Sequence, residues 1–197
     1  METLQTLFEQ LFSGDEEQAE AAAPAFAAHG LAAVKALREH WQRENEDASS
    51  AVDRRWWILR ALAEIDDPQA VEILIEALQS PDPSLRQCAA LGLARQRSPR
   101  AVPALSAALD DPDTLCADLA REALIAAGEP AVPKLLEVLE NGSRPARIRA
   151  VRALAYIGDR RAIPALFRAL EADSTLMEYW ASEGLDRMGV GMSFFKP

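Results

Sequence analysis

The chain has 197 residues, with 21 lysines and arginines against 31 aspartates and glutamates, so its formal net charge is −10. Hydrophobic residues make up 49% of it, a share that excludes an intrinsically disordered chain. The acidic balance disfavours nucleic acid as a partner, because phosphate binding needs clustered positive charge.

No apolar run approaches the roughly 20 residues that a membrane span needs. Residues 1–15 lack the basic start and apolar stretch of a signal peptide. Two cysteines, Cys88 and Cys116, are too few to staple a fold of this size and are typical of reduced thiols. We therefore expect a soluble, cytoplasmic protein with no membrane span.

The first 48 residues predict three helices, over 2–12, 15–28 and 31–43, separated by Ser13-Gly14 and His29-Gly30. They fit the pattern of the later chain poorly. Because terminal repeats must present one polar face to water, we interpret residues 1–48 as an atypical capping segment, with an acidic start at Asp15, Glu16, Glu17 and Glu20.

From residue 49 to residue 189 the chain repeats itself. Ala70-Val71-Glu72-Ile73-Leu74 returns as similar segments that begin at Ala101, Ala131 and Ala162, at steps of 31, 30 and 31 residues. A period of this length indicates stacked supersecondary units. Each repeat is predicted to contain two helices. The first is expected over 68–79, 99–110, 129–140 and 160–172, and the second over 50–65, 84–96, 114–127, 144–157 and 175–188.

Short polar connectors precede the second helices, and Ser84, Thr114, Ser143 and Ser174 are predicted as their N-caps. No linker interrupts the pattern, so the sequence predicts one continuous domain, an all-α right-handed solenoid of about twelve helices. Residues 190–197 form an apolar tail that is too short for another repeat. Its Met192, Phe194 and Phe195 are expected either to cover the last helix pair or to dock a partner.

The segment from Arg147 to Leu166, RIRAVRALAYIGDRRAIPAL, resembles the HEAT repeat of the phycobilisome-lyase type, as do 85–90 and 177–185. The resemblance covers residues 50–189 well and implies that the second helix of each pair lines a concave face. The family includes bilin lyase subunits, bilin-transfer chaperones, a phycobilisome-degradation factor, an iron–sulfur scaffold-binding protein and plain scaffolds.

The outward residues of the second helices follow from the 100° step of a helix. We count from the leucines of the repeat, Leu62, Leu93, Leu124, Leu154 and Leu185. Positions −8, −4, −1, 0 and +3 then form the core side. The opposite side is centred on −6, with −2, −9 and +1 around it, and −5 lies at the rim of the core. The predicted partner-binding residues at these outward and rim positions are Trp56, Trp57, Arg60, Leu91, Ile148, Arg149, Arg152, Tyr179 and Trp180.

Aromatic and arginine side chains supply most of the energy of a binding interface, so this face predicts a protein-binding scaffold. Trp57 and Trp180, at the rim, are expected to pack partly as core. The resemblance implies an auxiliary factor in phycobilisome maturation or turnover, whose partner is a phycobiliprotein or a second HEAT-repeat subunit.

Two alternatives stay open. The chain could be a bilin lyase subunit or chaperone that binds a phycobilin transiently, with Arg60, Arg149 and Arg152 paired to its propionates. It could also assist iron–sulfur assembly, which would need an accessible Cys88 or Cys116. Catalytic or metal-binding residues are not predicted: the two histidines, His29 and His40, lie outside the clear repeats, and the His-Glu pairs that hold iron in deoxyhypusine hydroxylase have no counterpart.

Overall fold

The computed structural model describes residues 2–43, 49–172 and 174–190. Their regular structure is helical throughout, from α1 to α12 with four short 3-10 helices, η1 to η4, and the described residues contain no strand. The all-α class predicted from the periodicity is confirmed. Residues 191–197 of the tail, with Met192, Phe194 and Phe195, lie outside the described residues.

The chain divides into two compact units, one ending at Ala101 and the other beginning at Val102. The helices of unit 1 are α1 (Leu4–Leu11), α2 (Glu16–Ala22), η1 (Ala23–His29), α3 (Gly30–Arg43), α4 (Ser49–Leu62), α5 (Pro68–Ala77), α6 (Pro83–Gln96) and η2 (Pro99–Ala101). Those of unit 2 are α7 (Val102–Ala108), α8 (Thr114–Ala127), η3 (Glu129–Ala131), α9 (Val132–Asn141), α10 (Arg144–Ile157), η4 (Arg160–Ala162), α11 (Ile163–Leu170) and α12 (Thr175–Arg187). The boundaries 1–48, 49–189 and 190–197 stay a prediction.

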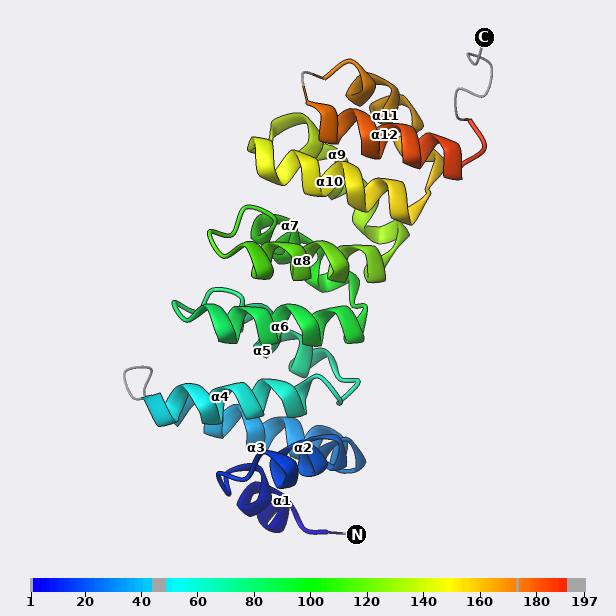
Figure 1. The fold of residues 1–197 in the computed structure, drawn as a ribbon. Coiled ribbons are helices and arrows are strands. Elements are labelled where there is room, and N and C mark those ends of the chain that lie inside the picture. Colours follow the sequence, from blue (N-terminus) through cyan, green and yellow to red (C-terminus); the bar gives the residue numbers. More distant parts are fainter. Residues whose placement is uncertain (1, 44–48, 173, 191–197) are drawn as a thin grey trace. The chain divides into compact units, whose positions relative to one another are not determined.

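Within each unit the helices stack as pairs, and the second helices of successive pairs pack side by side (Figure 1). In unit 1, α4 packs on α6; in unit 2, α10 lies between α8 and α12. Small residues allow close approach at these contacts: a Cβ placed on Gly184 of α12 would lie 2.9 Å from the Cα of Ala155 in α10. The alternation of leucine with alanine and glycine therefore sets the spacing of the second helices.

The helix starts differ in part from the prediction. Asp82 and Asp113, not Ser84 and Thr114, are the N-caps of α6 and α8, and their carboxylates accept hydrogen bonds from backbone N–H groups of the first turn. Aspartate competes well for the cap position, and in each case it lies upstream of the residue that we predicted. Ser143 caps α10 as predicted, whereas Ser174 occupies the N-cap of α12 without a side-chain cap bond.

The first helices of the later pairs begin with a 3-10 turn. The predicted helix at 129–140 is divided into η3 and α9, and the one at 160–172 is divided into η4 and α11. Pro133 and Pro164 stand in the first turn of α9 and α11, and proline has no N–H with which to continue an α-helical ladder upstream. The α-helix therefore starts one residue before each proline.

Candidate functional site

The leucines of the repeat define the core side of every second helix. Leu62, Leu124 and Leu154 are fully buried, and Leu93 and Leu185 are 1% exposed. The core register predicted from the 100° step is therefore confirmed. Position +1 was wrongly placed on the outward side at two helices, because Ala63, just after α4, is 7% exposed and Ala155 of α10 is fully buried.

The predicted binding residues belong to both units and keep some exposure. Leu91 and Tyr179 are more than half exposed, at 54% and 57%, and the other seven are partly buried. Those of unit 1 are Trp56, Trp57, Arg60 and Leu91, and those of unit 2 are Ile148, Arg149, Arg152, Tyr179 and Trp180. That the two groups act as one site stays a prediction.

In unit 2, α10 and α12 bring an arginine and two aromatic rings together. The guanidinium carbon of Arg152 lies 4.5 Å from the centre of the Trp180 ring. The rings of Tyr179 and Trp180 meet edge to face, 4.9 Å apart. Arginine above the face of tryptophan is the favourable cation–π arrangement. We call the group of Arg152, Tyr156, Tyr179, Trp180 and Arg187 the unit 2 surface.

Tyr156 and Arg187 belong to this surface but were missed by the sequence prediction. The Tyr156 ring is 40% exposed and lies 5.8 Å from that of Trp180, and the guanidinium carbon of Arg187 lies 4.6 Å from the Tyr156 ring centre. Both residues stand two places after a leucine of the repeat. That position, +2, lies about 200° around the helix from the core leucine, so the same arithmetic would have found it.

Arg149 is engaged inside unit 2. Its Nε donates to the Asp118 carboxylate of α8 at 3.2 Å, and its Nη1 donates to the backbone carbonyl of Leu109 at 3.1 Å. The side chain is only 15% exposed. Arg149 therefore ties α10 to the preceding pair, and its guanidinium is less available to a partner than the sequence suggested.

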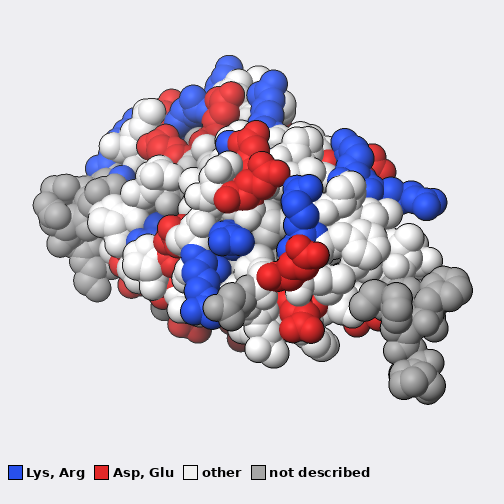
Figure 2. Space-filling model, turned by 90° about the horizontal axis from the view of Figure 1, so that it is seen from above, with Lys and Arg blue, Asp and Glu red and all other residues white. Residues whose placement is uncertain are grey.

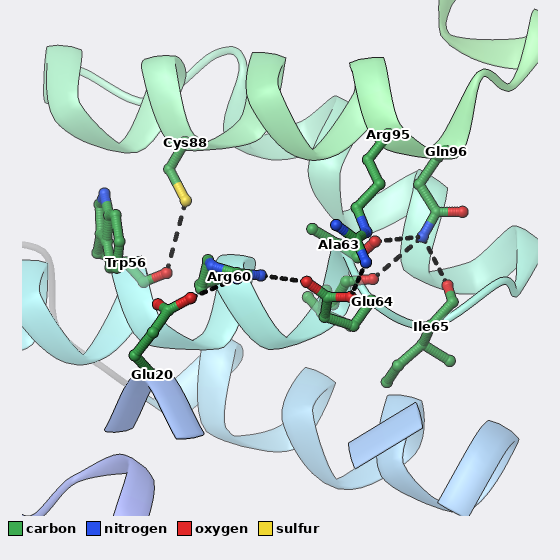
Figure 3. Close-up of polar contacts among 10 residues, drawn as sticks. Glu20, Trp56, Arg60, Ala63, Glu64, Ile65, Cys88, Arg95 and Gln96 are labelled. Carbon is green, nitrogen blue, oxygen red and sulfur yellow. Dashed lines mark hydrogen bonds and ion pairs between the residues drawn. The ribbon is translucent and has the colours of Figure 1, made fainter. Parts of the chain in front are cut away.

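Arg60 is engaged in the same way inside unit 1. Its Nη2 donates to the Glu20 carboxylate of α2 at 2.5 Å, and its Nη1 to Glu64, which also pairs with Arg95 of α6. Figure 3 shows this chain of contacts running from α2 through α4 to α6. Burial acts to lower the pKa of Arg60, but the hydrogen bonds that it donates to Glu64 and Glu20, and the charges of these carboxylates, outweigh burial and raise that pKa. Arg60 thus links three helices.

Both cysteines are buried. The thiol of Cys88 donates to the backbone carbonyl of Trp56 across the α4–α6 contact, at 3.6 Å (Figure 3). Burial raises the pKa of this thiol to about 12, so it stays protonated, and a protonated thiol is a poor nucleophile and metal ligand. Neither thiol has the accessibility that the iron–sulfur alternative would need.

The raised pKa of the Cys88 thiol predicts that the folded chain loses stability at alkaline pH. In the unfolded chain a cysteine ionises near pH 8.5, whereas Cys88 in the folded chain ionises near 12. The unfolded chain therefore loses its proton first, so this contribution to stability is complete below about pH 8.5 and is lost as the pH rises towards 12. We expect urea unfolding at pH 8 and pH 10 to show a smaller alkaline loss in Cys88→Ala than in the wild type. An equal loss in both would contradict the burial of this thiol.

Unit 1 also contains an open cleft of about 990 Å³ between the end of α1, the start of α2, the outer face of α4 and the start of α6. Trp56 and Trp57 of α4 contribute to its walls, with ring centres 4.8 Å apart. The two rings meet nearly at right angles, so one presents its edge to the face of the other. The cleft is therefore an aromatic surface that helices of unit 1 enclose on several sides.

Charges of both signs are mixed on the face of the molecule drawn in Figure 2. On the face in Figure 2, lysines and arginines are interleaved with aspartates and glutamates, and neither sign covers that face. Within the described residues, no helix is both long and apolar enough to cross a membrane. In the same residues no three histidine, cysteine, aspartate or glutamate side chains are placed to hold one metal ion.

Comparison with known proteins places these features in a family. A family model described as HEAT repeats matches residues 46–125 and 132–191. A phycocyanobilin lyase subunit beta of Pseudanabaena tenuis is 40% identical over 121 residues, which are 61% of this chain and 38% of that protein. A phycobilisome maturation protein of Synechococcus elongatus is 36% identical over 115 residues, 58% of this chain and 55% of that protein.

The solved complex of CpcE and CpcF of phycocyanin lyase from Nostoc is similar in structure. The TM-score is 0.55 at 25% sequence identity, covering 96% of this chain and 78% of that chain. The α-solenoid class predicted from the sequence is confirmed by this likeness. The matched part of the chain spans about two-fifths to one-half of the length of the two curated relatives described above.

Proposed function

The chain belongs to the HEAT-repeat family, and we propose that it is a protein-binding scaffold that serves as an auxiliary factor in phycobiliprotein maturation or turnover. Its partner on this proposal is a phycobiliprotein or a second HEAT-repeat subunit. Stacked repeats offer extended surfaces of the kind that such partners need. A cytoplasmic location, expected from the sequence, belongs to the same proposal.

One observation carries the proposal: the unit 2 surface exposes aromatic and arginine side chains that the core of the unit does not need. Tyr156 and Tyr179 are 40% and 57% exposed, and Arg152 and Arg187 lie over the rings of this surface. Tyrosine, tryptophan and arginine dominate the residues whose loss costs most at interfaces. The relatives support the proposed class of partner, since one is named as a phycocyanobilin lyase subunit and another as a phycobilisome maturation protein.

Direct binding of a bilin is the second candidate, and the unit 2 surface favours it too. Within the described residues, neither Arg152 nor Arg187 forms an ion pair with a carboxylate, and the buried Nε of Arg152 has no hydrogen-bond partner. A linear tetrapyrrole offers apolar rings for Trp180 and Tyr179 and propionates for these two arginines. Arg60 and Arg149, by contrast, are held by Glu20, Glu64 and Asp118. On this candidate the chain is a bilin lyase subunit or chaperone.

Replacing Tyr179 with alanine tests the scaffold. We expect binding to purified phycocyanin α-subunit, or to a CpcE- or CpcF-type subunit, to weaken by about five- to thirtyfold in calorimetry, which corresponds to about 1–2 kcal/mol. The melting temperature should change little, because an exposed side chain leaves no cavity. Phe167→Ala is the matched control, since Phe167 is a 42% exposed aromatic on α11 outside the unit 2 surface, and it should leave binding unchanged.

Equal losses in Tyr179→Ala and Phe167→Ala would show that the unit 2 surface is not the binding site. The bilin candidate is read separately, from the visible absorbance of phycocyanobilin added to the purified protein. A shift that Arg152→Gln abolishes supports direct chromophore binding. An unchanged spectrum, with protein binding intact, supports the scaffold alone.

A further inference from the structure

The cleft in unit 1 combines two features that the proposed function does not use. It has aromatic walls, from Trp56 and Trp57 and from Phe12 at the end of α1. It also has an acidic rim, from Glu16 and Glu17 of α2 and Asp53 of α4. At about 990 Å³ it reaches the upper end of the range of ligand pockets, so it has room for several side chains rather than for one ion.

The three rim carboxylates have no cationic partner among the described residues. Glu16, Glu17 and Asp53 are exposed, and within the described residues none of them forms an ion pair with a lysine or arginine. Glu20, which also lines the cleft, differs because it binds Arg60. Among the described residues that line the cleft, Arg54 is the single basic one, so this lining carries an excess of negative charge.

A structural role accounts for only part of this charge. Glu16 and Glu17 lie in the first turn of α2, where acidic residues stabilise the helix through its dipole. That effect fades beyond the first turn, and Asp53 is the fifth residue of α4. Helix stabilisation therefore does not explain Asp53, nor the position of the carboxylates beside two half-buried tryptophans.

We propose that this cleft binds a segment of a partner polypeptide that carries lysine or arginine side chains. The rim carboxylates would pair with the cationic groups, and the faces of Trp56 and Trp57 would receive the cations and the aliphatic stems of the same side chains. The excess of negative charge in the cleft disfavours an anionic occupant such as a bilin propionate. The site lies wholly in unit 1, so it stands independently of the unit 2 surface and of the proposed function.

The test uses two labelled octapeptides, one of alternating alanine and lysine and one of alternating alanine and glutamate, with the full chain in fluorescence anisotropy. We expect the lysine peptide to bind, with an affinity that falls as salt is added, and the glutamate peptide not to bind. The double variant Glu16→Gln/Glu17→Gln should weaken binding about tenfold or more. Trp57→Ala should weaken it by a similar factor, through loss of the ring that receives the cation.

The control removes the same charge elsewhere. Glu178 is in the first turn of α12 and Glu171 is the C-cap of α11, so Glu171→Gln/Glu178→Gln changes the net charge equally without touching the cleft. Binding to this variant should match the wild type. If both double variants weaken binding of the lysine peptide equally, the peptide is attracted only by the net negative charge of the protein. That result would overturn the proposal. The absence of binding by the lysine peptide to the wild type, or unchanged affinity in Trp57→Ala, would overturn it as well.

Discussion

Replacing Leu154 with alanine should lower the free energy of unfolding by about 2–5 kcal/mol. Leu154 is fully buried at the centre of the core side of α10, which packs against α8, α9 and α12. Three neighbouring helices cannot all move in to fill the space of the lost atoms, so a cavity remains and adds to the lost transfer energy. Urea unfolding followed by circular dichroism measures the change.

Leu176→Ala is the matched control for Leu154→Ala. Leu176 stands in the first turn of α12 and is 56% exposed, so the same substitution should change the free energy of unfolding by no more than about 0.5 kcal/mol. A loss of that small size in Leu154→Ala itself would mean that the register of the second helices is wrong, together with the assignment of their outer positions.

Replacing Gly184 with alanine should destabilise the chain by about 1–3 kcal/mol. The new Cβ would lie 2.9 Å from both the Cα and the Cβ of Ala155, and a helix backbone cannot turn aside as a side chain can. Relief requires α10 and α12 to separate, which loosens the whole contact. This cost outweighs the gain of about 1 kcal/mol that alanine brings over glycine inside a helix.

Gly92 gives the comparison for Gly184, because it holds the same position of the repeat in α6. A Cβ there would meet the two terminal methyl groups of Leu74 at 3.0 and 3.2 Å and the Cβ of Ala63 at 3.1 Å. The leucine methyls can shift by a few tenths of an ångström, so the gain in helix propensity offsets most of the strain. We expect Gly92→Ala to stay within about 1 kcal/mol of the wild type. Thermal melts that rank Gly92→Ala below Gly184→Ala would contradict the packing described here.

The periodicity of the sequence predicted the helix pairs and the core leucines because both depend on the chain's local pattern. Leucines at steps of 30 or 31 residues must repeat the same environment when the pairs stack, and Leu62 and Leu185 do so. The errors of the sequence prediction concern single positions within the helix pairs. Asp82 and Asp113 precede the predicted caps, and position +2, which holds Tyr156 and Arg187, was left out of the outward face.

The partners of the arginines depend on neighbours that the pattern does not reveal. Arg60 is outward by register, yet Glu20 reaches it from α2, forty residues earlier in the chain. Arg149 likewise binds Asp118 in the preceding pair. The cleft of unit 1 depends on the arrangement of α1 and α2, which do not follow the repeat, so its shape could not be derived from the periodicity.

The side chain of Gln96 has a consequence for how unit 1 comes apart. Its Nε2 donates to the backbone carbonyls of Leu62, Ala63 and Ile65, at 3.3, 3.1 and 2.7 Å (Figure 3). Leu62 is the last residue of α4, and the other two lie just beyond it. The last carbonyls of a helix have no partner within it; here those of Ala61 and Leu62 accept from the N–H groups of Glu64 and Ile65 in the following turn. Gln96 of α6 adds a further bond to Leu62 and holds that turn in place. If α6 detaches, the end of α4 loses the bonds from Gln96 at the same moment as the Glu64–Arg95 ion pair. Fraying of the end of α4 is therefore coupled to detachment of α6. The two helices should open as a single cooperative segment.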